Sequence, residues 1–401
     1  MARTRKRALW VVGESSYGVD PDANDDGAEY TYVPGTVGDL KDGKAQYATD
    51  YATGRNFPTK PVAGPDGWSF DLEVPVTGMA TAAGSGTNAS TVTDDYLDIL
   101  AIHMFAAKTT FAGTTVSATG AASITAASDN WSVQDIIPVH EALVPSGAAR
   151  TQWTSIRVDS PGGTYSTVAP AWDAVPTTSA LIYGAKLYQP SDAGGASLAF
   201  VYQQDDIYYN LLGGRVTSAT ISGVIDTYVK LKLSISGDTK TQESARASLP
   251  ASTFSRVPCK ALLSPVFLSA LGTPKVACKS FEIDLGISAS PVTSTAAADG
   301  RADYQSIMMA PVITLQPLFT NEIQNLKRAL TSSRILIQFG AGVLSGGVLN
   351  TCAIHAEEVH AVEADPADDA GIQRQSLKLQ VSDSGEFSSG VLARKFQFLR
   401  A

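Results

Sequence analysis

Charged residues are scarce in this 401-residue chain: they make up 17% of it, well under the quarter that is usual for globular domains. The 30 basic residues are outnumbered by 39 acidic ones, which gives a net charge of −9. Without an excess of Lys and Arg to neutralise phosphates, we expect no sequence-independent binding of nucleic acid. Apolar residues reach 44%, too many for a disordered chain, and 34 glycines with 20 prolines exclude a helical bundle.

Cysteine is scarce as well. Cys259, Cys278 and Cys352 are an odd number without a C-x-x-C pair, so we expect free thiols and not a disulfide framework. The sequence contains no P-loop, no G-x-S-x-G nucleophile elbow and no H-E-x-x-H motif. We therefore expect no cofactor and no catalysis.

Long apolar runs are also missing. No window approaches the 18 or so apolar residues of a membrane span, so no membrane partner is expected. An apolar run of about six residues follows the basic start of the chain, shorter than the roughly seven to fifteen of a signal peptide. We expect a soluble product made in a cytoplasm, beginning with a basic arm that contains Arg3, Arg5, Lys6 and Arg7.

The commonest pattern in the chain is alternation of apolar and polar residues. Successive side chains of a strand point to opposite faces, so each alternating segment predicts a strand with one buried and one solvated face, as in antiparallel sheets. The segments are 70–76, 229–235, 281–287, 335–339 and 377–381.

Two segments predict helices. Thr93 to Lys108 begins with a capping Thr and two Asp residues and carries apolar residues at helical spacing. The second segment, Thr320 to Leu330, has Ile323, Leu326 and Leu330 on one face. We expect both helices to be one-sided and to cover the open side of a sheet. The predicted fold class is mainly β: an antiparallel sandwich or barrel with two short α-helices.

A possible internal duplication relates residues 69–105 to residues 280–330, because each contains an alternating strand, a loop and a helix. The alternative is that any two amphipathic strands look alike. Residues 77–92 and 288–303 are rich in Gly, Ala, Ser and Thr, so we expect long loops that become ordered on a neighbouring molecule.

Three short motifs resemble functional sites, but each is better interpreted as ordinary secondary structure or a turn. His355 to His360 contains two His and two Glu, but on a strand these alternate between faces, which favours a solvated strand over a metal site. Asp22 to Asp26 resembles the start of an EF-hand loop, but Val33 stands at the twelfth position, so an Asx-rich turn is favoured over a cation site. Gly340 to Gly346 is predicted to be a hairpin turn. No metal is expected.

The segment 206–224, DIYYNLLGGRVTSATISGV, is followed by the strongly alternating segment 228–237. Together they resemble the central hairpin of tail tube proteins (major tail proteins) of long-tailed bacteriophages, with an aromatic-Gly strand, a V-x-S-x-x-I strand, a turn and an alternating strand. Residues 276–288, 304–320 and 367–381 resemble the family's next strands, the long loop between them and its final strand. The resemblance covers roughly residues 200–400.

The resulting division of the chain has four parts. They are 1–27, a basic N-terminal arm and first strand; 28–110, the first part of a tube module that resembles the family more loosely; 111–200, an insertion or additional β subdomain; and 201–401, the rest of the tube module.

The resemblance implies a structural virion protein without catalysis. In this family the inner sheets of β-sandwich subunits join into a barrel, and the rings, usually hexameric, stack along a tape-measure protein to form the channel for genome ejection. If the duplication is real, three copies would close a ring. Further implied partners are tail terminator and baseplate proteins, while DNA passes through the lumen without specific binding. The implied location is the virion tail, assembled in the cytoplasm of the host bacterium.

The candidate site residues follow from this resemblance. Asp71, Glu73, Glu282 and Asp284 lie on the polar side of the best-patterned strands and are predicted to face the lumen; an outer solvated face is the alternative. A ring of six would carry about −54 charges, which would keep DNA from binding to its wall. The predicted contacts between rings are Arg3, Arg5, Lys6, Arg7, Gly84, Ser85 and Gly86.

An alternative function is a β-sandwich module that binds carbohydrate or a receptor on a virion or cell surface. Trp131, Trp153 and Trp172 lie in the part of the chain without a family counterpart, where they could stack on sugars.

Overall fold

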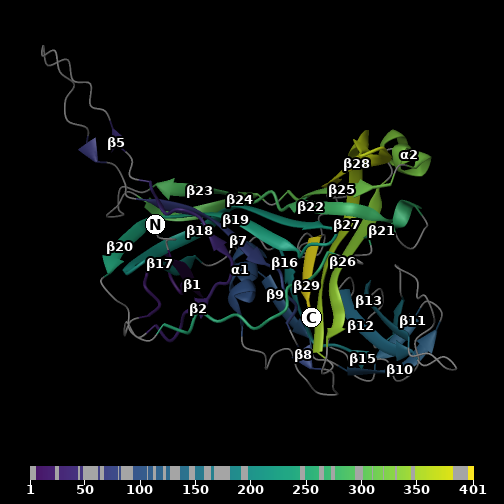
Figure 1. Cartoon of the computed structure of the whole chain (residues 1–401), viewed down its shortest axis with the longest axis horizontal. Helices are drawn as coiled ribbons and strands as arrows, with labels where there is room; N and C mark the ends of the chain where they lie inside the picture. Colours follow the sequence, from purple (N-terminus) through teal and green to yellow (C-terminus); the bar gives the residue numbers. More distant parts are fainter. Residues whose placement is uncertain are drawn as a thin grey trace, which may run out of the picture.

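Antiparallel strands dominate the computed structural model of the chain (Figure 1). Every strand pairing among the described residues is antiparallel, which together with two short α-helices confirms the predicted mainly β fold. The structure describes residues 6–22, 27–43, 46–47, 62–63, 67–79, 81–82, 94–105, 107–111, 114–120, 123–126, 136–143, 150–157, 164–166, 181–190, 197–243, 249–261, 266–271, 276–293, 301–308, 310–318, 320–329, 332–344, 348–382 and 396–401.

Nineteen strands form one main sheet. They are β1 (Arg7–Gly13), β2 (Thr31–Tyr32), β3 (Thr36–Val37), β4 (Lys41–Asp42), β7 (Trp68–Pro75), β8 (Thr81–Ala82), β9 (Ala107–Phe111), β16 (Ala185–Gln189), β17 (Leu198–Gln204), β18 (Ile207–Val224), β19 (Lys230–Gly237), β20 (Thr239–Glu243), β21 (Val266–Leu268), β22 (Cys278–Asp284), β25 (Val312–Pro317), β26 (Ser333–Leu344), β27 (Val348–Asp369), β28 (Ile372–Val381) and β29 (Phe396–Arg400).

Two long strands connect the layers of this sheet. The first half of β18 pairs with β17 and β20, and its second half pairs with β19 and β22. The first half of β27 pairs with β26 and β29, and its second half pairs with β28. The sheet therefore folds over on itself, and its apolar sides enclose one continuous core.

One layer of the main sheet has the strand order β7–β19–β18–β22–β25–β28, and alternation correctly located four of its strands, β7, β19, β22 and β28. In β7 the residues Phe70, Leu72 and Val74 are buried, while the residues between them are half-buried or exposed. Segment 335–339 is the exception. It lies in β26, where Leu336 and Gln338 are buried as well, so the predicted solvated face is wrong for this strand. The reason is that β26 is covered on both sides.

Aromatic side chains fill the core beneath this layer. Trp68 stacks on Phe70, and both rings contact Phe200. Burying a large apolar side chain contributes roughly 1.5–3 kcal/mol, so such clusters are the main favourable term in the free energy of folding.

The first helix, α1 (Tyr96–Phe105), differs from its prediction in two ways. Its cap is Asp95, whose Oδ1 accepts hydrogen bonds from the backbone N–H groups of Leu97 and Asp98, whereas Thr93 lies outside the described residues. It is also not one-sided. All of its residues are buried or half-buried, because α1 lies inside the molecule against β1, β9, β16 and β18.

The second helix, α2 (Asn321–Ala329), behaves as predicted. The Thr320 hydroxyl accepts a hydrogen bond from the Ile323 N–H at 3.3 Å, and Ile323 and Leu326 are buried. Neither α-helix in the described part of the chain has the length and apolar content that crossing a bilayer requires.

A separate six-stranded sheet lies within the expected range 111–200 (Figure 1). The main sheet resumes at β16, however, so the upper boundary at residue 200 is too late. The strands of this inserted sheet are β10 (Thr114–Gly120), β11 (Ser123–Ala126), β12 (Ile136–Leu143), β13 (Arg150–Arg157), β14 (Thr164–Ser166) and β15 (Leu181–Ile182).

The segments expected to be loops contain ordered structure. Residues 288–293 form β23 (Ser288–Thr293), which pairs with β24 (Arg301–Met308) in a hairpin, so a long loop at 288–303 is wrong for these residues. In segment 77–92, Thr77, Gly78 and Met79 are buried within the chain itself, although the segment was expected to become ordered on a neighbouring molecule. The remaining described elements are the strand pair β5 (Gln46–Tyr47) and β6 (Val62–Ala63) and the 3-10 turn η2 (Ser269–Leu271).

Two further expectations change. The predicted turn at 340–346 begins too early, because β26 continues to Leu344 with a bulge between Gly340 and Gly342. The two segments of the possible duplication differ in element order. Three strands, β23 to β25, separate β22 from α2, whereas β8 is the one described strand between β7 and α1.

Close backbone packing at Gly78 yields a testable prediction. An added Cβ there would lie 2.7 Å from both Asn350 Cα and Thr351 N, which are backbone atoms that cannot rotate away. We expect Gly78→Ala to lower the free energy of unfolding by about 1–3 kcal/mol. The control is Gly13→Ala, where nothing lies within 4 Å, with an expected change below about 0.5 kcal/mol. Urea denaturation measures both, and equal stabilities would contradict the described packing.

Candidate functional site

The four predicted lumen residues lie on the same side of the main sheet. Glu73 of β7 lies directly opposite Lys232 of β19. On the next strands, Lys232 lies opposite Thr220 of β18, and Thr220 lies opposite Asp284 of β22. Side chains directly opposite each other on paired strands share a face. A parallel row passes from Ser222 through Glu282 and Thr314 to Lys378.

We call this surface the polar face. Its residues are Asp71, Glu73, Ser218, Thr220, Ser222, Lys230, Lys232, Ser234, Glu282, Asp284, Thr314, His360, Glu363, Lys378 and Gln380, with Val312 as an apolar interruption. It spans seven strands, and the core lies on the other side of the layer.

Most charges on the polar face are paired. Glu73 Oε1 lies 2.7 Å from Lys230 Nζ, and this hydrogen bond raises the pKa of Lys230 above its ordinary value. Glu363 lies 3.6 Å from Lys378. Among the described residues, Glu282 and Asp284 take part in no ion pair, so the uncompensated negative charge of this face lies on β22. Asp284 Oδ1 accepts a hydrogen bond from the Gly286 N–H at 2.9 Å.

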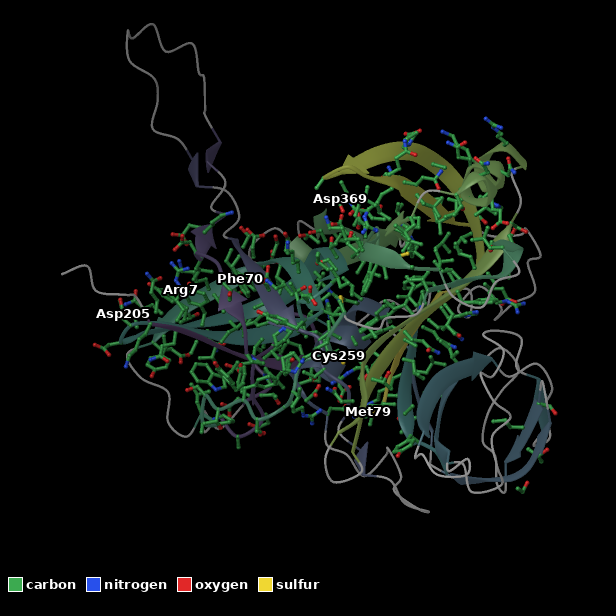
Figure 2. All side chains as sticks on the ribbon, turned by 45° about the vertical axis from the view of Figure 1, so that its right-hand side comes forward. Arg7, Phe70, Met79, Asp205, Cys259 and Asp369 are labelled. Carbon is green, nitrogen blue, oxygen red and sulfur yellow. The ribbon has the colours of Figure 1, made fainter. Side chains whose placement is uncertain are left out.

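Two of the residues predicted to form contacts between rings, Lys6 and Arg7, lie within the described residues. Arg7 is half-buried; it forms an ion pair with Asp39 and donates a hydrogen bond to the Val37 carbonyl at 3.0 Å. Lys6 is exposed and is hydrogen-bonded through its backbone to Asp205, at the end of the molecule where Figure 2 labels Arg7 and Asp205. The other predicted contacts, Arg3, Arg5, Gly84, Ser85 and Gly86, lie outside the described residues.

The weak motifs resolve into structural roles. The Asp22 carboxylate is buried and accepts a hydrogen bond from the Gly27 N–H at 2.7 Å, while residues 23–26 lie outside the described residues. His355 is buried, while Glu358 and His360 lie 4.0 Å apart on the half-exposed side of β27. No group of three His, Cys, Asp or Glu side chains in the described ranges could hold a metal ion. Trp131 and Trp172 lie outside those ranges, and Trp153 is part of β13.

The three cysteines are free, as predicted. Cys259 and Cys352 are buried with their sulfur atoms 3.9 Å apart, and burial raises the pKa of Cys352 well above its usual value. Burial also raises the pKa of Cys278 to about 12.

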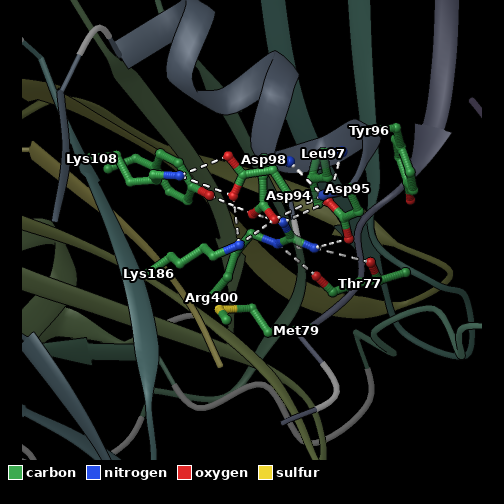
Figure 3. A network of polar contacts seen from close by, with 12 residues as sticks. Thr77, Met79, Asp94, Asp95, Tyr96, Leu97, Asp98, Lys108, Lys186 and Arg400 are labelled. Carbon is green, nitrogen blue, oxygen red and sulfur yellow. Dashed lines mark hydrogen bonds and ion pairs between the residues drawn. The ribbon is translucent and has the colours of Figure 1, made fainter. Parts of the chain in front are cut away.

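Behind the polar face, inside the core, lies a network of buried ion pairs (Figure 3). The guanidinium of Arg400 is 0% exposed; its Nη2 lies 2.8 Å from Asp95 Oδ2, and its Nη1 contacts Asp98. Its Nε donates to the Thr77 carbonyl at 3.0 Å. Lys186 Nζ lies 2.8 Å from Asp98 Oδ2. The network therefore joins β29, α1, β16 and the segment that follows β7.

Two more cations complete the network at its rim. Lys108 and Lys186 both lie 2.8 Å from Asp94, and Arg256 Nη1 lies 2.6 Å from Asp95. Burial alone would raise the pKa of Asp95, but Arg400 and Arg256 outweigh it and hold that pKa far below its usual range. The Asp94 pKa is lowered in the same way by Lys108 and Lys186, against the opposing effect of burial.

The sequence pattern predicted the acidic start of the helix at Asp94 and Asp95 but not the cations that bind it. Arg400 ends β29 and Lys186 stands in β16, two strands in which every residue is buried, and Asp98 stands inside a mainly apolar helix. A charge in such a run is the signal that would have identified them, since buried charges require a partner.

No family model matches the chain, and no curated protein matches it either.

The buried network generates a stability prediction. Arg400→Met leaves Asp95 and Asp98 without their central cation, and breaking a buried pair costs about 3–5 kcal/mol. We therefore expect a loss of that size in the free energy of unfolding. The control is Lys41→Met, which removes an exposed ion pair of 3.7 Å to Asp71 and should cost less than about 1 kcal/mol.

The pH dependence of the stability of the unmodified chain and of Arg400→Met gives a second measurement. Because the pKa values of Asp94 and Asp95 are lower in the folded state, the stability that they contribute is present above about pH 4 and is lost as the pH falls through the folded values. We expect the unmodified chain to lose stability steeply below about pH 4 and Arg400→Met to show a shallower decline. Parallel curves would contradict the assignment.

Proposed function

We propose that this chain is a structural subunit that assembles into stacked rings, of the kind that form bacteriophage tail tubes, with the polar face lining the channel. The observation that carries the proposal is the polar face itself, which extends across seven antiparallel strands and is backed on its other side by the core. A tube wall needs this arrangement, because its inner surface is wet while the wall itself must be held together by apolar packing.

The edges of the main sheet also suit assembly. Within the described residues β20 pairs with β18 alone. The backbone N–H and C=O groups along its other edge therefore form no hydrogen bonds with a neighbouring described strand. Unpaired edges invite strand addition, and joining sheets between copies removes them. The subunit would thus complete its sheet in the ring.

The charge of the polar face fits a channel that DNA passes through. Cations on this face are engaged by neighbouring carboxylates, as Lys230 is by Glu73, while Glu282 and Asp284 form no ion pair with any residue that the structure describes. Tight DNA binding requires Lys and Arg that are free to neutralise phosphates. The proposed wall would therefore let DNA slide without holding it. The proposed location is the virion tail, with a tape-measure protein, a tail terminator and a baseplate as partners.

Negative-stain electron microscopy of the purified chain tests the assembly. We expect rings or tubes, with six subunits per ring, or three if the chain contains two tube modules. Monodisperse single particles at all concentrations and salt conditions would contradict the proposal and favour the binding-module alternative.

The direction of the polar face has its own test in a Glu282→Cys variant. In unassembled subunits we expect the introduced thiol to react with a small maleimide and with one attached to a bulky polymer. In assembled tubes it should react with the small reagent alone, because the polymer cannot enter the channel. Equal reaction with both reagents in tubes would place Glu282 on the outside.

A further inference from the structure

Two of the three cysteines meet in the core of the molecule. The Sγ atoms of Cys259 and Cys352 lie 3.9 Å apart, although the two residues are 93 positions apart in the sequence. Both side chains are 0% exposed, and both belong to the main core cluster. Two thiols in contact can do what a single buried cysteine cannot, because each sulfur can form a covalent bond to the other.

The two cysteines belong to different layers of the main sheet. Cys259 lies at the ends of β7 and β19: its N–H donates to the Val76 carbonyl at 2.8 Å, and its carbonyl accepts from the Val229 N–H at 2.8 Å. Cys352 lies in β27, directly opposite Phe339 of β26. A bond between the two sulfur atoms would therefore link the layer of β7 and β19 to the layer of β26 and β27.

The hydrogen-bond partners of the two thiols hold them weakly. Cys352 Sγ lies 3.5 Å from the Thr77 carbonyl oxygen, and Cys259 Sγ lies 3.5 Å from Asn350 Oδ1. A thiol is a weak hydrogen-bond donor, so these contacts do little to keep the sulfur atoms apart. A disulfide bond is about 2 Å long, so closing it takes an approach of roughly 2 Å that two side chains can share.

Contact between the thiols favours a disulfide over separate oxidation of each sulfur. Once one sulfur carries a mixed disulfide with a small molecule, the other is already in place to attack it, so the second step is intramolecular. Burial raises the pKa of Cys352 and so suppresses its reactive thiolate. We therefore expect the reaction while the chain folds, before the core covers the thiols. The closed bond is then protected by the same burial.

We propose that Cys259 and Cys352 form an oxidation site, which closes to a disulfide when the chain folds in an oxidising environment and ties the two layers together. The oxidant is a low-molecular-weight disulfide such as oxidised glutathione. One protein thiolate attacks it and releases a first glutathione thiol; the second protein thiolate attacks the mixed disulfide and releases the other. The protein sulfurs lose two electrons, the small disulfide gains them, and the protons of the protein thiols end on the released thiols. This proposal does not depend on tube assembly.

Two preparations of the full chain test the proposal, one from a bacterial host with a reducing cytoplasm and one from a host with an oxidising cytoplasm. Free thiols are alkylated in denaturant, and mass spectrometry of unreduced digests identifies linked peptides. We expect peptides linked through Cys259 and Cys352 in the second preparation alone. Because the bond closes a long loop, we also expect the thermal midpoint to rise by about 2–8 °C and to fall again after reduction with dithiothreitol.

The matched control is Cys278→Ser, which removes the half-buried third thiol and should leave both the link and the higher midpoint unchanged. Cys352→Ser should abolish both, and Cys259→Ser gives the same comparison if that variant fails to fold. Free thiols at both positions in the chain from the oxidising host would overturn the proposal. So would mixed disulfides with glutathione at these positions, a link through Cys278, or a linked chain that keeps the midpoint of the reduced one.

Discussion

The burial of one guanidinium group governs how the layers of this molecule meet. Arg400 ends a fully buried strand and has no access to water, and its charge is tolerated because Asp95 and Asp98 lie against it. Removing a charge from water is costly, so it is stable only where several partners converge. Here the partners come from the start of α1 and from the segment after β7, while Lys186 of β16 balances the second carboxylate. Moving α1 away from β29 would separate Arg400 from Asp95 and Asp98 and leave these charges buried without each other.

This constraint explains the environment of α1. Asp95 caps the helix and binds Arg400, and Asp98 accepts a hydrogen bond from the Asp95 N–H at 3.1 Å while it also binds Lys186. The same carboxylates thus begin the helix and fix it between the sheet layers. The layer above is then free to present its other side to solvent, which is the surface proposed to line a channel.

Much of that layer could be predicted from sequence, because a strand with one wet side alternates in polarity. Phe70, Leu72 and Val74 in β7 are the clearest case, and the acidic residues between them fall on the polar face. Alternation fails where both sides are covered. In β26 and β29 polar residues such as Gln338 and Gln397 are as buried as their apolar neighbours. The ion network could not be predicted from the sequence for a different reason. Asp95 and Arg400 are 305 residues apart, and no local sequence pattern links them. Local capping was ambiguous too, because Thr93, Asp94 and Asp95 are all acceptable caps.

The length of β27 bears on how the subunit would respond to mechanical force. Its 22 residues give a contour of about 70 Å at roughly 3.3 Å per residue, and the strand belongs first to one layer and then to the other. A pull along this strand loads the hydrogen bonds to β26 and β28 in shear, so that many must break together and none can be peeled off singly. The covalent backbone, and not the contact between layers, would carry the tension across the molecule.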